Sequence, residues 1–251
     1  TLPLANDYSY ALTPNQFSQI TACAKSHRAT AYHLFIAALA IYFCRTQGLN
    51  EIVMGVPVLN RSGKRYKEAL GMFTMVIPLR VTVAPADTTA DLLGQITASL
   101  RGAYRHCHYP LSHLVRDLQM IQQGRDNLFD VVLSYEIQNF TGHFGAAPTS
   151  DPYQAFGQTT RYPLSLTVCE FHQGEPVKVV LGSSNDYFTA DETARSCKRI
   201  HHLLMRMIDN PDVTVNALPL LLDEEHHDLI VNKHAGIPQH PNPQPFITAF
   251  E

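Results

Sequence analysis

The sequence predicts an α/β fold, a two-layer sandwich in which helices cover one mixed β-sheet. Some segments carry apolar residues at helical spacing behind capping signals, whereas others are short, rich in β-branched residues and alternating in polarity. They are interleaved in the order two helices, two strands, two helices, three strands and one helix. Interleaving of this kind is typical of a helix layer on a sheet. The 45% apolar content of the 251 residues is enough for its core.

The first half of the chain supplies two helices and two strands. Thr13 and Gln16 form a capping box, so a helix is predicted within residues 12–28. Residues 30–47 are apolar on nearly all sides and stop at a glycine, which indicates a buried helix. Residues 51–58 and 76–83 have the β-branched composition of strands. We interpret the polar, basic stretch between them as a functional loop.

The second half repeats the pattern. A helix is predicted from Thr88 to His106, and a shorter one after Pro110 is expected to lie beside it in one layer. The later elements are a strand at 128–135 buried on both faces, a hairpin of 164–171 with 177–181, and a helix from Thr189 to Asn210. Residues 139–160 are too long and polar for an ordinary connection, so they are either disordered or an arm reaching a neighbour.

We expect one folded domain over residues 1–235, followed by a proline-rich linker over 236–251. The chain begins at Thr1 without an initiator methionine, and we expect it to be a piece of a longer protein.

Composition excludes several classes of protein. The net charge of -3, from 19 basic and 22 acidic residues spread along the chain, provides no surface for nucleic acid or for a membrane. The five cysteines are scattered without a C-x-x-C pair, which argues against disulfides and structural zinc and favours the cytoplasm. The longest apolar run is too short to cross a bilayer.

Common catalytic signatures are absent: there is no G-x-S-x-G, Walker loop, G-x-G-x-x-G or H-E-x-x-H. Histidine is the one enriched reactive type, with 13 residues. We expect His201 and His202 to be solvated or capping side chains that do not face one site, because neighbours on a helix point about 100° apart. His226 and His227 fit an exposed helix start, and His106 fits a cap at the negative helix end. We therefore expect neither a catalytic residue nor a metal site in this chain.

Three motifs together resemble those of nonribosomal peptide synthetase condensation domains. Residues 70–76, followed by Arg80, are similar to the motif I-G-x-F-V-N-T with its arginine, although Met75 stands where asparagine is usual. Residues 106–111 are similar to H-Q-D-Y-P-F, and residues 125–129 are similar to the ending R-N-P-L-F, although the Arg-Asp that opens that motif is missing. The closing segment resembles the passage toward an adenylation domain.

The resemblance implies a fold of two chloramphenicol-acetyltransferase-like lobes, of which this chain resembles the C-terminal one. The intact domain would form an amide between substrates on two carrier proteins. The catalytic motif H-H-x-x-x-D-G, which the resemblance places on the other lobe, does not occur in this chain. We therefore expect the isolated chain to be inactive.

The resemblance also assigns positions. Arg61 would pair with the aspartate of the missing motif, residues 62–70 would form a loop under the substrate tunnel, and residues 139–160 would latch onto the other lobe. The expected tunnel or interface residues are Arg61, Gly71, Phe73, Met75, Arg80 and His106. No cofactor would bind directly, apart from the phosphopantetheine arm of the carrier proteins.

The expected partners are the N-terminal lobe, peptidyl carrier proteins and an adjacent adenylation domain, and the isolated lobe is expected to self-associate. Two alternatives remain open: a docking module without catalysis, and a self-sufficient acyltransferase that uses His106 as its base.

Overall fold

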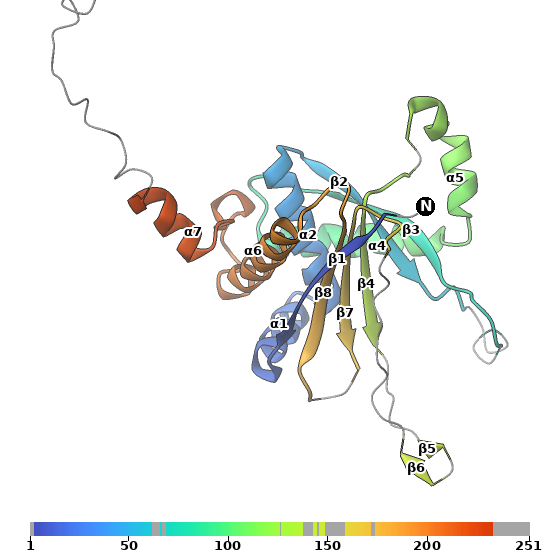
Figure 1. Cartoon of the computed structure of the whole chain (residues 1–251), viewed down its shortest axis with the longest axis horizontal. Helices are drawn as coiled ribbons and strands as arrows, with labels where there is room; N and C mark the ends of the chain where they lie inside the picture. Colours follow the sequence, from blue (N-terminus) through green and yellow to red (C-terminus); the bar gives the residue numbers. More distant parts are fainter. Residues whose placement is uncertain are drawn as a thin grey trace, which may run out of the picture.

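The computed structural model describes residues 3–61, 66, 69–125, 127–137, 143–144, 146–148, 159–171 and 174–232. A six-stranded mixed sheet with a layer of helices fills this part of the chain (Figure 1), which confirms the predicted fold class. The strands, in the order β1-β8-β7-β4-β2-β3, are β1 (Ala5–Leu12), β8 (Val177–Ser184), β7 (Leu164–Glu170), β4 (Val131–Ile137), β2 (Glu51–Val58) and β3 (Met75–Thr82).

The pairing of the strands is mixed. The β7–β8 hairpin, the β1–β8 pair and the β2–β3 pair are antiparallel, whereas β4 runs parallel to both of its neighbours, β7 and β2. The parallel connection from β2 to β4 passes through β3 and then through two helices, Thr89–Arg105 and Leu111–Asp117.

Four long helices pack against the sheet: α1 (Pro14–Ser26), α2 (Ala31–Gln47), α4 (Thr89–Arg105) and α6 (Ala190–Asp209). The predicted capping box at Thr13 is confirmed, and Thr88 and Thr189 form the same kind of box at the starts of α4 and α6. Each threonine side chain accepts a hydrogen bond from the backbone N–H three residues on. Helix α2 ends at Gly48, whose φ of +65° favours glycine. Its middle is fully buried, as the all-round apolar pattern predicts.

Three expectations are corrected. The sequence reading missed edge strand β1, because its polar residues alternate with half-buried tyrosines and resemble a loop. Strand β4 begins at Val131 rather than at residue 128, and its second half is only half-buried. Helix α5 (Leu111–Asp117) buries no residue completely and lies beside β3 and η1 (Met120–Gln123), so it does not form a layer with α4.

The chain leaves the sheet through short elements: η2 (Val215–Ala217), α7 (Asp223–His227) and η3 (Asp228–Asn232). Glu225 of α7 forms a 2.9 Å ion pair with Arg199 of α6, which connects the two helices. His226 and His227 are exposed on α7, as expected.

Several predicted segments lie largely outside the described residues. The proposed latch contributes only the two-residue strands β5 (His143–Phe144) and β6 (Ala147–Pro148) and residues 159–160. Residues 233–251 are also outside, so the domain boundary at 235 stays a prediction. No single helix among the described residues has the length and apolarity to cross a bilayer; only α1 and α2 taken together, bent by 93°, have the required composition.

Candidate functional site

The sheet divides into two arms between β2 and β4. These strands share a single bridge, Gly55 with Val132, whereas β4 and β7 pair along their whole length. The close approach at the bridge requires glycine, because a Cβ on residue 55 would lie 2.3 Å from Cε2 of Phe129. Past the bridge, Pro57 lacks the N–H that would extend the ladder. The carboxyl ends of β2 and β4 therefore separate.

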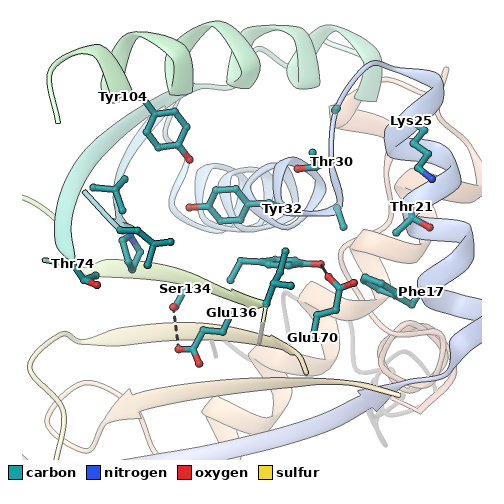
Figure 2. Close-up of a pocket in the computed structure, with 17 residues that line it drawn as sticks. Phe17, Thr21, Lys25, Thr30, Tyr32, Thr74, Tyr104, Ser134, Glu136 and Glu170 are labelled. Atoms are coloured by element: carbon teal, nitrogen blue, oxygen red, sulfur yellow. Dashed lines mark hydrogen bonds between the residues drawn. The ribbon is translucent and has the colours of Figure 1, made fainter. Parts of the chain in front are cut away.

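A cavity of about 720 Å³ lies in this opening (Figure 2). Its walls come from the carboxyl ends of β2, β4 and β7, the first turn of α2, one side of α1 and Tyr104 of α4. The carboxyl ends of parallel strands are where open α/β sheets bind ligands. The fold therefore places this cavity, which polar and aromatic side chains line, at a position suited to a substrate.

Three tyrosines line the cavity. The rings of Tyr32 and Tyr135 meet edge-to-face with centroids 5.9 Å apart, and Tyr135 packs in the same way on Phe35 at 6.2 Å. Burial raises the pKa of Tyr32, Tyr104 and Tyr135, and the hydrogen bond to Glu170 raises the pKa of Tyr135 further. All three phenols are therefore neutral at physiological pH and can donate hydrogen bonds.

Two carboxylates occupy the same cavity. The Tyr135 hydroxyl donates to Oε2 of Glu170 at 2.7 Å, and the Ser134 hydroxyl donates to Oε1 of Glu136 at 3.3 Å. Lys25 stands on the α1 side (Figure 2). None of the described residues that line the cavity is a histidine or a cysteine. This set of groups can bind and orient a polar substrate, but it does not include histidine, the side chain that most often transfers protons near neutral pH.

Arg61 lies on the loop that leaves β2. Its Nη1 donates to the carbonyl oxygens of Tyr66 and Ala69, both at 2.6 Å, and its Nη2 donates to the carbonyl oxygen of Gly71 at 2.8 Å. The guanidinium also stacks 4.4 Å from the ring centroid of Phe73. Arg61 thus organises its own loop. The aspartate expected to pair with it belongs to a motif that this sequence lacks, so that pairing stays a prediction.

The other loop residues lie beside the cavity without lining it. Gly71 has a φ of +140°, which favours glycine. The sulfur of Met75 accepts a hydrogen bond from Nδ2 of Asn60 at 3.1 Å. Phe73 is half-buried under Arg61, and Thr74, between Phe73 and Met75, is the residue of this motif that reaches the cavity.

Arg80 and His106 lie away from the cavity. Arg80 is exposed on β3 and forms a 3.8 Å ion pair with Glu51. His106 is the exposed C-cap of α4, as expected, and its N–H donates to the carbonyl oxygen of Ala103 at 3.1 Å. Of the six predicted site residues, the structure gathers Arg61, Gly71, Phe73 and Met75 in one loop region and leaves these two separate.

The expectation for His201 and His202 is wrong. Both are half-buried and line one hollow between β1, α6 and α7. His201 stacks on Tyr10 with centroids 4.6 Å apart, and within the described part of the chain Nδ1 of His201 and Nε2 of His202 have no hydrogen-bond partner. Burial lowers the pKa of both rings. The hollow is wide, so that two neighbouring residues of one helix line it even though their side chains point about 100° apart.

Among the described residues, no three His, Cys, Asp or Glu side chains are placed to hold a metal ion. The sequence reading also missed Tyr32, Tyr104, Tyr135, Glu136 and Glu170. A signal was present, because Tyr135-Glu136 and Glu170 are polar endings of otherwise apolar strands. The strand order that brings these endings together could not be read from the pattern.

Comparisons with known proteins point to one family. The model of a family described as "Condensation domain" matches residues 4–230. Surfactin synthase subunit 1 of Bacillus subtilis (strain 168) is 24% identical over 212 residues, covering 84% of this chain and 6% of that protein. Equisetin synthetase eqxS of Fusarium heterosporum is 27% identical over 242 residues, covering 93% of this chain and 6% of that protein.

The fold is that of solved condensation domains. The first condensation domain of the CDA synthetase superposes with a TM-score of 0.73 at 19% identity, covering 88% of this chain and 49% of that one. The chain thus spans about half of the solved domain and a small fraction of each curated relative.

Proposed function

The chain belongs to the condensation-domain family of nonribosomal peptide synthetases, and from this premise we propose that it is the C-terminal lobe of such a domain, residues 1–235. In this proposal the lobe provides one wall of a site where an amide forms between two carrier-bound substrates. The cavity between β2 and β4 is the observation that supports it. Its phenols, carboxylates and aromatic rings suit the binding of a substrate.

The proposed reaction defines what this wall has to do. The amine of one carrier-bound substrate attacks the thioester carbon of another, so that a C–N bond forms, the C–S bond breaks and the carrier thiol leaves. The nitrogen must also lose a proton, which requires a base. We assign that base to the histidine of H-H-x-x-x-D-G on the N-terminal lobe, because the motif is absent from this sequence. The isolated chain is then inactive.

Arg61 retains the capacity to pair with the aspartate of that motif. A guanidinium has five N–H groups, and three of those of Arg61 donate to the loop carbonyls. Nε–H and one hydrogen of Nη2 have no acceptor among the residues that the structure describes, and we propose that they serve an acceptor from another lobe. The guanidinium of Arg61 would then bind both its own loop and the catalytic motif of the partner lobe.

A double-mutant cycle tests this pairing in a domain where this chain is joined to the half that carries H-H-x-x-x-D-G. If Arg61→Ala and removal of the motif aspartate interact, their effects on the rate of amide formation will be strongly non-additive. Additive effects would contradict the pairing.

The partner lobe is proposed to cover the loop after β2. Leu59, Leu70 and Met72 are 72%, 101% and 94% exposed, an unusual position for three large apolar side chains. Arg80, His106 and the segment 139–160 are proposed as further lobe contacts. Self-association of the isolated lobe would follow from the same surface.

The remaining partners are also proposals. A phosphopantetheine arm would deliver each substrate, residues 236–251 would lead to an adenylation domain, and the enzyme would work in the cytoplasm.

Filling the cavity tests the proposal. In a domain where this chain is joined to the half that carries H-H-x-x-x-D-G, Thr74→Trp should slow amide formation at least about tenfold, because the indole would occupy space needed by the substrate. Thr82→Trp is the matched control, since Thr82 is also an exposed threonine and lies at the far end of β3 from Thr74. Equal rates for both variants and the unmodified domain would contradict the proposal.

A further inference from the structure

The cavity presents a carboxylate held in one orientation. Glu170, the last residue of β7, is half-buried, and its Oε2 accepts the hydrogen bond from Tyr135. Tyr135 is fixed in turn by its edge-to-face contacts with Tyr32 and Phe35. Part of the side-chain freedom that Glu170 would lose on binding a ligand is thus already restricted.

Aromatic rings surround this carboxylate. Phe17, Tyr32 and Tyr135 line the same cavity as Glu170 (Figure 2). The faces of aromatic rings attract cations, and ring surfaces also accommodate the methylene stems of long cationic side chains. A carboxylate among such rings is suited to a positively charged group on an aliphatic stem.

The charged side chains of the cavity favour a positively charged ligand. The described charged side chains that line it are Glu136 and Glu170 on the strands and Lys25 on α1, but Glu136 lies in register with Cys169 and Lys178, on the opposite face of the sheet from Tyr135. Lys25 is exposed on the α1 side, next to Thr21, so its ammonium remains in contact with solvent. The carboxylate of Glu170 therefore remains on the strand side of the cavity, and a ligand with one positive charge would offset it.

We propose that this cavity recognises a cationic side chain, an ammonium or guanidinium group, on a carrier-bound substrate, with Glu170 as its ion-pairing partner. Tyr135 is the positioning residue for Glu170, and the rings hold the stem of the ligand. This inference rests on the proposed function, because it takes the cavity to be a substrate site. The volume of about 720 Å³ is sufficient for an aminoacyl group and the end of its carrier arm.

Two probes that differ only in charge test the inference. N-acetyl-ornithine and N-acetyl-norleucine, each joined through an amide to aminopantetheine (pantetheine with an amine in place of its thiol), have side chains of the same length, with a methyl group of the second in place of the ammonium group of the first. Calorimetric titration of the 251-residue chain should show that the ornithine probe binds about tenfold more tightly. Glu170→Gln should abolish this preference, and Tyr135→Phe should reduce it without abolishing it.

Glu51→Gln is the matched control, because Glu51 is an exposed carboxylate at the opposite end of β2. It should keep the full preference, and thermal unfolding should show that every variant is folded. Equal binding of both probes to the unmodified chain would overturn the cationic specificity while leaving the cavity as a substrate site. A preference that survives Glu170→Gln would overturn the assignment of Glu170. Failure of both probes to bind at millimolar concentration would overturn the proposed use of the cavity as well.

Discussion

The two arms of the sheet differ in how they are held together. In the longer arm, β1, β8, β7 and β4 pair along continuous ladders, and their inward residues form the core with α2 and α6. The shorter arm is the β2–β3 pair, which joins the longer one at the bridge between Gly55 and Val132. The continuous ladders provide stability, and the incomplete joint leaves the space that we interpret as a substrate site.

The seven residues of strand β4 contribute both to the core and to the cavity. Val131, Val132 and Leu133 are buried, whereas Ser134 to Ile137 are half-buried or exposed and line the cavity. One strand therefore serves the core with its first half and the site with its second. Substitutions along it should separate stability from binding.

The largest expected effect lies in the buried half. Leu133→Ala should lower the free energy of unfolding by about 2–5 kcal/mol, because Leu133 is fully buried and truncation leaves a cavity. Ser134→Ala, one residue further, should cost less than about 1 kcal/mol. Urea titration of the two variants measures the difference. Similar losses would show that the two halves of β4 do not differ as described.

The joint between the arms should tolerate no side chain at residue 55. Gly55→Ala should destabilise the chain by about 1–3 kcal/mol, because the new Cβ would overlap the ring of Phe129. Phe129→Leu in the same chain should restore part of the loss, so that the two substitutions are non-additive in urea titrations. Additive losses would contradict the close approach at the joint.

The edge of the longer arm should make stability depend on pH. Burial lowers the pKa of His201, and His202 lowers it further. The unfolded chain protonates this ring near pH 6.5, while the folded chain resists protonation. Stability should therefore fall as the pH falls below about 6.5 toward the pKa of the folded state. His201→Gln should weaken the dependence measured between pH 7.5 and 5.5. A control at the exposed His108, His108→Gln, should leave it unchanged, and equal slopes would refute the assignment.

The smallest effect is expected on the surface of the shorter arm. Arg80 and Glu51 are both mostly exposed, and their ion pair spans 3.8 Å. Arg80→Ala should change the free energy of unfolding by less than about 1 kcal/mol and should respond little to added salt. A larger loss in urea titrations would mean that this pair contributes to holding the arms together.

The sequence predicted the elements better than the site. Capping boxes at Thr13, Thr88 and Thr189 and the apolar pattern of α2 are local signals, and the structure confirms them. Strand β1 was missed because its pairing with β8 is a long-range contact.

The site itself depends on which strands become neighbours. Tyr135 and Glu170 are 35 residues apart in sequence and meet only because β4 and β7 pair in parallel. The motif around Arg61 was recognised by resemblance, yet its bonds to three loop carbonyls depend on the path of the backbone.

The most direct test of the central claim is amide formation by the purified 251-residue chain given both carrier proteins loaded with substrates. The account predicts no product above the uncatalysed background, and product once the half carrying H-H-x-x-x-D-G is added. Turnover by the chain alone would contradict it, because the base would then have to lie within these residues.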